Sequence, residues 1–214
     1  MTARIVDPAL VATGVAHLCA VDPIMAGTIA AVGTCTLTLE ANLFYALVDA
    51  IMSQQISVKA AASILKRVCA LYAPDPFPTP ERLAATPDED LRAAGCSRAK
   101  VIYLKDLAAQ IVAGSIDLAR LPQLSDEEIV QALVAVRGIG RWTAEMLLIF
   151  SLGRLDVWPV DDLGIVIAAQ GIYQLPARPK RKELLALGEP WRPYRTIAAW
   201  YLWQSRRIVL GMPW

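Results

Sequence analysis

Cysteine and histidine are scarce in this chain of 214 residues. The cysteines lie too far apart in sequence to form a close metal-ligand cluster or the framework of a small disulfide-stabilised domain. We expect four free thiols, at Cys19, Cys35, Cys69 and Cys96. The one histidine, His17, we expect to be a packed or surface residue rather than a catalyst.

Long apolar runs and charged residues are also few. No uninterrupted apolar run reaches the roughly 20 residues that span a bilayer. The first residues, MTARIVDP, do not place a basic segment before an apolar core, so we expect no signal peptide and a cytoplasmic protein. Charged residues make up 19% of the chain and hydrophobic residues 56%, which favours a well-packed domain over disorder.

The net charge of +1 argues on its own against a nucleic-acid-binding protein. The charges are unevenly distributed, however, with basic residues concentrated between Arg178 and Arg207 and acidic residues at 88–90 and 126–128. This basic stretch could attract phosphate or could be a solvated tail, and charge alone leaves both readings open.

The hydrophobic pattern predicts helices joined by short loops along nearly the whole chain. A short extended piece is expected at 34–39, and Ser125 with Glu128 forms the sequence pattern of a capping box. We expect loop structure at 178–181. The expected helices cover residues 8–20, 40–56, 58–72, 97–114, 163–171 and a last segment that opens at 191–195.

The stretch from Leu133 to Ile165 carries the most information. Gly138-Ile139-Gly140 predicts a tight turn between two helical segments. The first amides of the following helix would point out of this turn, where they could bind a phosphate. Gly153 is expected to end that helix. Asp161 and Asp162 then precede another apolar run, and an aspartate in this place can cap the next helix or supply a carboxylate for chemistry.

This order of hairpin, helix and Pro-Asp resembles the helix-hairpin-helix (HhH-GPD) DNA glycosylases, in particular their 3-methyladenine DNA glycosylase II branch. The motifs that carry the resemblance are residues 136–144 and 159–163, with further similarity at 50–72, 91–107 and 191–203. The resemblance implies an all-α, two-lobed fold without the N-terminal β domain of larger relatives. It implies one catalytic domain over residues 1–214, with a central lobe of roughly 49–155 that includes the hairpin 133–147, and a second lobe of 1–48 plus 163–214.

The resemblance also implies an activity: a monofunctional DNA glycosylase that extrudes alkylated bases and excises them by hydrolysis of the N-glycosidic bond in base excision repair. Asp162 falls at the catalytic position, whereas Asp161 falls where relatives vary. Trp142 stands where bifunctional members carry a lysine, so no Schiff base can form.

Further site residues follow from the same resemblance. The base is expected to contact Trp142, Met146, which is aromatic in some relatives, and Trp203. Trp191 and Trp200 are expected in the core. Gln55 matches the residue that fills the gap left by an extruded base. The expected DNA contacts are Gln54, Gln55, Gly138, Gly140 and Thr143.

The expected partner is double-stranded DNA with alkylated bases, bound by a monomer that does not associate with membranes. We expect no metal or cofactor apart from a possible monovalent cation at hairpin carbonyls; the iron–sulfur loop of some relatives is not expected because no cysteine follows Cys96. Three alternatives stay open: a mismatch or oxidised-base glycosylase of the same superfamily, a non-catalytic helix-hairpin-helix module, and an interaction-only helical protein. The preferred lesion also stays open.

Overall fold

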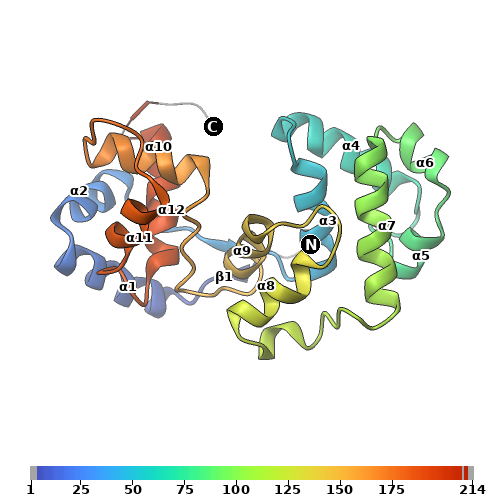
Figure 1. Ribbon diagram of the computed structural model, residues 1–214, viewed down its shortest axis with the longest axis horizontal. Helices are drawn as coiled ribbons and strands as arrows, with labels where there is room; N and C mark the ends of the chain where they lie inside the picture. Colours follow the sequence, from blue (N-terminus) through green and yellow to red (C-terminus); the bar gives the residue numbers. More distant parts are fainter. Residues whose placement is uncertain (1–3, 209, 212–214) are drawn as a thin grey trace. The chain divides into compact units, whose positions relative to one another are not determined.

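The computed structural model describes residues 4–208 and 210–211. Within these ranges the chain forms twelve α-helices, one short 3-10 helix and two strands of two residues each (Figure 1). The expected all-α class is confirmed. The elements are β1 (Arg4–Ile5), α1 (Pro8–Val21), α2 (Pro23–Val32), β2 (Thr38–Leu39), α3 (Leu43–Ser53), α4 (Val58–Ala70), α5 (Pro80–Ala85), α6 (Asp88–Ala93), α7 (Arg98–Val112), η1 (Leu121–Gln123), α8 (Asp126–Val134), α9 (Arg141–Phe150), α10 (Leu163–Ile172), α11 (Arg181–Gly188) and α12 (Arg195–Ile208).

The chain divides into two compact units. A terminal unit combines Met1–Ala41 with Leu148–Trp214, and a central unit consists of Asn42–Leu147. These boundaries precede the expected ones near residues 49 and 155, for two reasons. The central unit begins at Asn42, so it contains the whole of α3. There α3 packs against α4 and α7. The end of α9 belongs to the terminal unit, where the Phe150 carbonyl accepts the Glu40 N–H at 2.8 Å.

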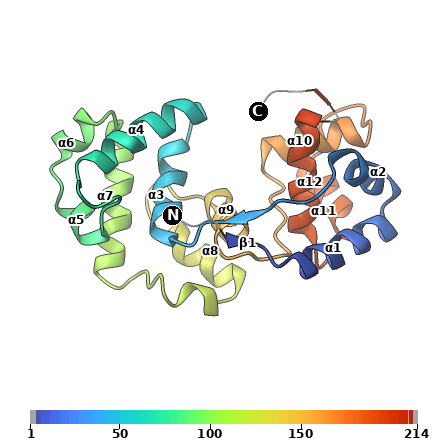
Figure 2. The same cartoon turned by 180° about the vertical axis from the view of Figure 1, so that it is seen from behind.

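In the terminal unit, α12 packs against α10, α2 and α1; Figure 2 shows α1 and α2 on one side of α12. The two strands pair antiparallel, with Arg4 opposite Leu39. Asp22 ties several elements together. One of its carboxylate oxygens caps α2, and the other accepts hydrogen bonds from the Tyr173 hydroxyl at 2.6 Å and the Trp191 indole at 2.9 Å.

In the central unit, α7 packs against α5, α3 and α6, and its buried face includes Leu104 and Leu107. Two helices of this unit begin at a serine that caps them. Ser97 accepts the Lys100 N–H at the start of α7, and the Ser125–Glu128 capping box is confirmed at the start of α8. Local sequence therefore sets where these helices begin.

Some predicted boundaries are wrong. The helix expected at 40–56 is α3, which ends at Ser53 because the chain turns at the two glutamines that follow. The loop expected at 178–181 ends one residue early, since α11 already begins at Arg181. Gly153 follows α9 with φ of 65°, in agreement with the expected helix end. No helix among the described residues is long and apolar enough to cross a membrane.

Candidate active site

The glycine hairpin lies in the central unit between α8 and α9. Two backbone hydrogen bonds close the turn: Val136 N–H donates to the Leu133 carbonyl at 3.0 Å, and Ile139 N–H donates to the Val136 carbonyl at 3.1 Å. Gly138 has φ of 82°. A Cβ on Gly138 would lie 2.2 Å from a ring carbon of Tyr103. The turn therefore needs glycine at this position both for its backbone conformation and for the close approach of a ring.

Gly140 lacks a side chain for a different reason. Gly140 is exposed and its φ is not positive. Among the described residues, leaving out its chain neighbours, no atom lies within 4 Å of a Cβ built on it. Its carbonyl accepts the Ala144 N–H at 3.1 Å, so Gly140 stands at the start of α9. The first N–H groups of a helix have no acceptor within the helix. Because Gly140 has no side chain, a phosphate could approach these N–H groups closely.

Thr143 lies in the first turn of α9, and its side chain is buried. Only 3% of this residue is exposed, because Thr143 and Leu147 are four residues apart and share the buried face of α9. The Thr143 side chain is therefore turned away from solvent, and the expected contact of this residue with a phosphate stays a prediction.

Helix α7 supports the hairpin, which the sequence did not reveal. The Asp106 carboxylate accepts the Arg137 N–H at 2.8 Å and the Gln110 amide at 2.9 Å. Together with the Tyr103 ring beneath Gly138, these contacts hold the turn on α7. Their spacing marks one face of a helix, but no local signal indicates that the hairpin, about 30 residues later, packs on that face.

Gln54 and Gln55 follow α3 in the central unit and face different surroundings. Gln54 is half-buried, and its side-chain amide donates to the Gly138 carbonyl at 2.8 Å. Gln55 is exposed and has φ of 57°, a conformation that is unusual outside glycine. The structure thus leaves Gln55 accessible for the expected DNA contact, whereas the Gln54 amide is engaged inside the protein.

In the terminal unit, Asp162 caps α10. Its Oδ1 accepts the Ile165 N–H at 2.9 Å and the Trp203 indole N–H at 2.9 Å, and the residue is half-buried. These two bonds fix the position of the carboxylate. The neighbouring Asp161 is exposed and pairs with Arg181. The two aspartates therefore have different environments, and Asp162 has the fixed one.

Gly164 lies beneath this carboxylate. A Cβ on Gly164 would lie 2.9 Å from Asp162 Oδ1, 3.1 Å from Trp203 Cδ1 and 3.3 Å from Arg206 Nη1. The Trp203 ring also packs on Phe150, with ring centroids 5.5 Å apart, and only 9% of Trp203 is exposed. The capping residue Asp162 and two side chains of α12 thus converge at Gly164. Sequence reasoning identified neither Gly164 nor Arg206 as part of the site.

The remaining candidate base contacts lie on α9. Trp142 is 41% exposed and Met146 is half-buried. They are four residues apart, so they share one face of the helix. Trp191 and Trp200 are buried, as expected for core residues.

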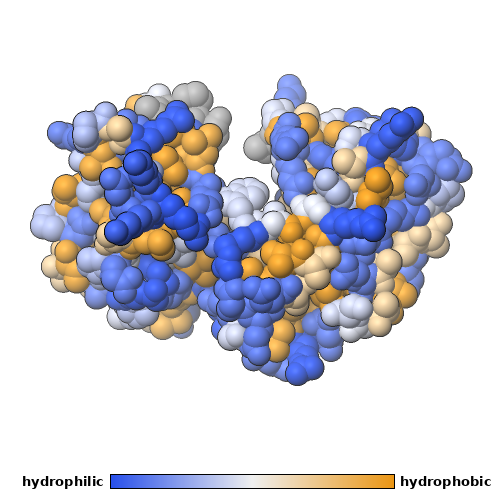
Figure 3. Space-filling view, in the orientation of Figure 1, coloured by the Kyte–Doolittle hydropathy of each residue, from blue (hydrophilic) through white to orange (hydrophobic). Residues whose placement is uncertain are grey.

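The basic stretch of the terminal unit is partly neutralised. Arg181 pairs with Asp161, while Arg192 and Arg195 both pair with Asp156. Hydrophilic side chains cover much of the face where α10, α11 and α12 lie (Figure 3). The exposed basic residues of this stretch are Arg178, Lys180, Arg181, Lys182, Arg192 and Arg207. The net positive charge of this stretch is smaller than its number of basic residues suggests, because neighbouring carboxylates offset part of it.

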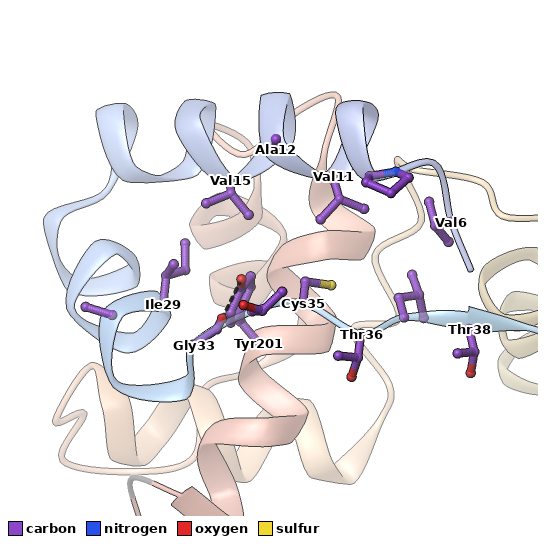
Figure 4. A pocket seen from close by; sticks show the side chains of 14 residues that line it. Val6, Val11, Ala12, Val15, Ile29, Gly33, Cys35, Thr36, Thr38 and Tyr201 are labelled. Atoms are coloured by element: carbon purple, nitrogen blue, oxygen red, sulfur yellow. Dashed lines mark hydrogen bonds between the residues drawn. The ribbon is translucent and has the colours of Figure 1, made fainter.

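Two further features do not belong to this site. Within the part of the chain that the structure describes, no group of three or more His, Cys, Asp or Glu residues could hold a metal ion. An apolar pocket of about 630 Å³ lies in the terminal unit between α1, α2, the segment before β2 and Tyr201 (Figure 4). Cys35 lines it, and burial raises the pKa of this thiol above its ordinary value, so little thiolate forms at neutral pH.

The hairpin and the capped carboxylate, on an all-α fold, define a class of base-excision protein, and comparison with known families agrees. Residues 48–193 match the model of the HhH-GPD superfamily base excision DNA repair proteins. The chain belongs to this superfamily.

Among individual proteins, the chain is similar to relatives named as 3-methyladenine or alkylbase glycosylases. DNA-3-methyladenine glycosylase 1 of Schizosaccharomyces pombe is 41% identical over 164 residues, 76% of this chain and 72% of that protein. The alkylbase DNA glycosidase-like protein mag2 of the same organism is 36% identical over 90% of this chain and 92% of its own length. The structure of the S. pombe 3-methyladenine DNA glycosylase in complex with abasic DNA superposes with a TM-score of 0.85 at 36% identity, covering 92% of this chain and 98% of that one.

Proposed function

We propose that this protein is a monofunctional DNA glycosylase that extrudes alkylated bases of the 3-methyladenine type and hydrolyses their N-glycosidic bond. The observation that carries the proposal is the Asp162 carboxylate, held by a backbone amide of α10 and by the Trp203 indole. The similarity to proteins named 3-methyladenine glycosylases supports the choice of substrate class.

The chemistry assigned to Asp162 is electrostatic. When the glycosidic bond breaks, positive charge develops on the sugar, and a fixed carboxylate beside it stabilises that charge and can orient the attacking water. An N-alkylated purine is itself cationic and leaves without strong acid assistance. One carboxylate can therefore suffice, and the indole at Trp142 supplies no amine for strand cleavage.

DNA binding is assigned to the hairpin and the loop after α3. The amides near Gly138 and Gly140 would bind backbone phosphate, which positions the protein without reading sequence. Hairpin carbonyls are suitable ligands for a monovalent cation that would add positive charge at the same phosphate. Gln55, exposed after α3, would fill the space left by the extruded nucleotide. We assign the protein a monomeric state, with one molecule acting on one lesion.

The aromatic residues are assigned to the base. Trp142, Trp203 and, at the position where some relatives are aromatic, Met146 would contact a cationic purine. Such contacts with an aromatic face contribute about 0.5–2 kcal/mol each. Extrusion costs a few kcal/mol, so a small number of these contacts, together with a weakened base pair at the lesion, can offset it.

The test is release of bases from methylated duplex DNA, with separation of the released bases and inspection of the strand before and after alkali. Wild-type protein should release alkylated bases and leave strands that break only after alkali. Asp162→Asn should abolish release, whereas the matched control Asp161→Asn should retain it, because Asp161 pairs with Arg181 at the surface. Tight DNA binding without release by the wild type would refute the proposal and indicate a binding module. Release of mismatched or oxidised bases alone would indicate another branch of the superfamily.

A further inference from the structure

The turn that follows α3, residues 54–57, is attached to the hairpin by one side chain; we refer to it as the plug loop. The Gln54 amide donates to the Gly138 carbonyl at 2.8 Å, across 84 residues of sequence. Both groups belong to the central unit. Gly138 is the residue at which the hairpin backbone turns back, with φ of 82°, so the bond joins the centre of one turn to the start of the other.

The α3 end of the plug loop is held by a buried cation. Lys100, from α7, donates its ammonium group to the Met52 carbonyl, two residues before Gln54. Lys100 is 8% exposed and Met52 is fully buried. An ammonium group at the C-terminus of a helix is favourable because the last carbonyls carry partial negative charge. The same α7 supports the hairpin through Asp106 and Tyr103, so both turns rest on one helix.

The backbone that follows these two attachments is strained. Gln55 has φ of 57°, and Ser57 then caps α4 by accepting the Ala60 N–H at 3.3 Å. A residue other than glycine keeps a left-handed backbone conformation only when the surrounding contacts impose it. The contacts available here are those of Gln54 and Lys100 on one side and the α4 cap on the other.

From these contacts we infer that Gln54 is a positioning residue that fixes the plug loop to the hairpin, so that backbone binding and insertion of Gln55 occur as one rigid step. This inference rests on the proposed function. Gln54 itself does not contact DNA in this role. It acts through Gln55, whose left-handed conformation it helps to maintain.

The perturbation is Gln54→Leu, which keeps the approximate size of the side chain and removes the donor. Affinity for undamaged duplex should stay within about twofold, because Asp106 and Tyr103 still hold the hairpin on α7. Single-turnover base release should slow by about tenfold, the scale of one lost hydrogen bond. The matched control is Gln131→Leu on α8, whose side-chain amide donates to the exposed Glu127 carboxylate at 2.9 Å. Its release rate should equal that of the wild type.

A double-mutant cycle separates positioning from direct contact. If Gln54 acts through Gln55, the Gln54→Leu/Gln55→Ala protein should release bases no more slowly than the slower single variant. Effects that multiply, or an equal loss of affinity for damaged and undamaged duplex, would overturn the inference in favour of an independent DNA contact. A wild-type release rate in Gln54→Leu would overturn it as well.

A second measurement does not depend on activity. Amide hydrogen exchange in the free protein should accelerate in Gln54→Leu at residues 55–57 and at residues 137–140 together, because one bond connects the two turns. Unchanged exchange in either segment would refute the attachment even if the wild type released no base, whereas absence of wild-type release alone would refute only the proposed function.

Discussion

The two hairpin glycines should respond in opposite ways to the same substitution. Gly138→Ala places a methyl group where Tyr103 already lies, at 2.2 Å, on a backbone with φ of 82°. Gly140→Ala places the methyl group in open space, at a residue whose φ is not positive. The first change therefore perturbs folding and the second perturbs access to the amides at the start of α9.

The magnitudes follow from these contacts. For Gly138→Ala, the left-handed conformation costs about 1–2 kcal/mol, and displacement of a packed ring costs about 1–3 kcal/mol. The free energy of unfolding should thus fall by about 2–5 kcal/mol in total. For Gly140→Ala, a poorer helix start costs up to about 1 kcal/mol, and reduced freedom of the unfolded chain offsets about 0.4–1 kcal/mol of this. The net change should stay within about 1 kcal/mol.

Urea denaturation and DNA binding distinguish the two outcomes. Gly140→Ala should unfold at nearly the wild-type urea concentration but bind undamaged duplex at least about tenfold more weakly, since its methyl group blocks close approach of a phosphate to the amides. Gly138→Ala should unfold at clearly lower urea. Wild-type DNA affinity in Gly140→Ala would refute the hairpin as the phosphate contact, and wild-type stability in Gly138→Ala would refute the account of the turn.

Three other predictions concern the terminal unit. Trp203→Phe keeps an aromatic ring but removes the donor to Asp162, so single-turnover base release should fall by about 10–100-fold, while circular dichroism should show an unchanged fold; equal rates would show that the indole bond does not matter. Asp22→Ala removes an acceptor for two backbone amides and two side-chain donors, and should lower the free energy of unfolding in urea by about 3–5 kcal/mol; a loss below about 1 kcal/mol would contradict this. Burial raises the pKa of Tyr201 from 10 to about 12, so its contribution to stability is complete below pH 10 and is lost as pH rises through 12. Stability measured from pH 9 to 12 should therefore decline less steeply in Tyr201→Phe than in the wild type, and identical slopes would refute the assignment.

Much of the helical fold could be predicted because its signals are local. Ser125 and Glu128 form the capping box that their spacing indicates, at the start of α8. The end of α3 was placed too late because Ser53-Gln54-Gln55-Ile56 contains no glycine or proline to mark the stop. What ends α3 is tertiary: the Lys100 ammonium on the Met52 carbonyl and the Gln54 amide on the hairpin.

Only the site residues that stand in sequence motifs could be predicted. Gly138, Gly140 and Asp162 stand in recognisable patterns, and the structure gives each a distinct local environment. The role of α7 was missed because the contact between Asp106 and the Arg137 amide joins segments that no periodicity relates. The burial of the Thr143 side chain was not predicted either, because the motif places this residue next to the hairpin without indicating which face of α9 it occupies.

The sequence allows Asp162 both to cap a helix and to supply a carboxylate for chemistry, and one oxygen atom of this residue is central to both proposed roles. The oxygen that accepts the Ile165 N–H also accepts the Trp203 indole N–H. The bond that caps α10 therefore also helps to orient the carboxylate. Asparagine can keep an oxygen in the same place and is as good a cap as aspartate, yet it carries no charge to stabilise a developing cation. Asp162→Asn should therefore preserve the free energy of unfolding while abolishing base release, whereas Asp162→Ala should lose the release and also about 1 kcal/mol of the cap. Equal stability losses in both variants would mean that the charge of Asp162, rather than the position of its acceptor oxygen, holds α10 in place.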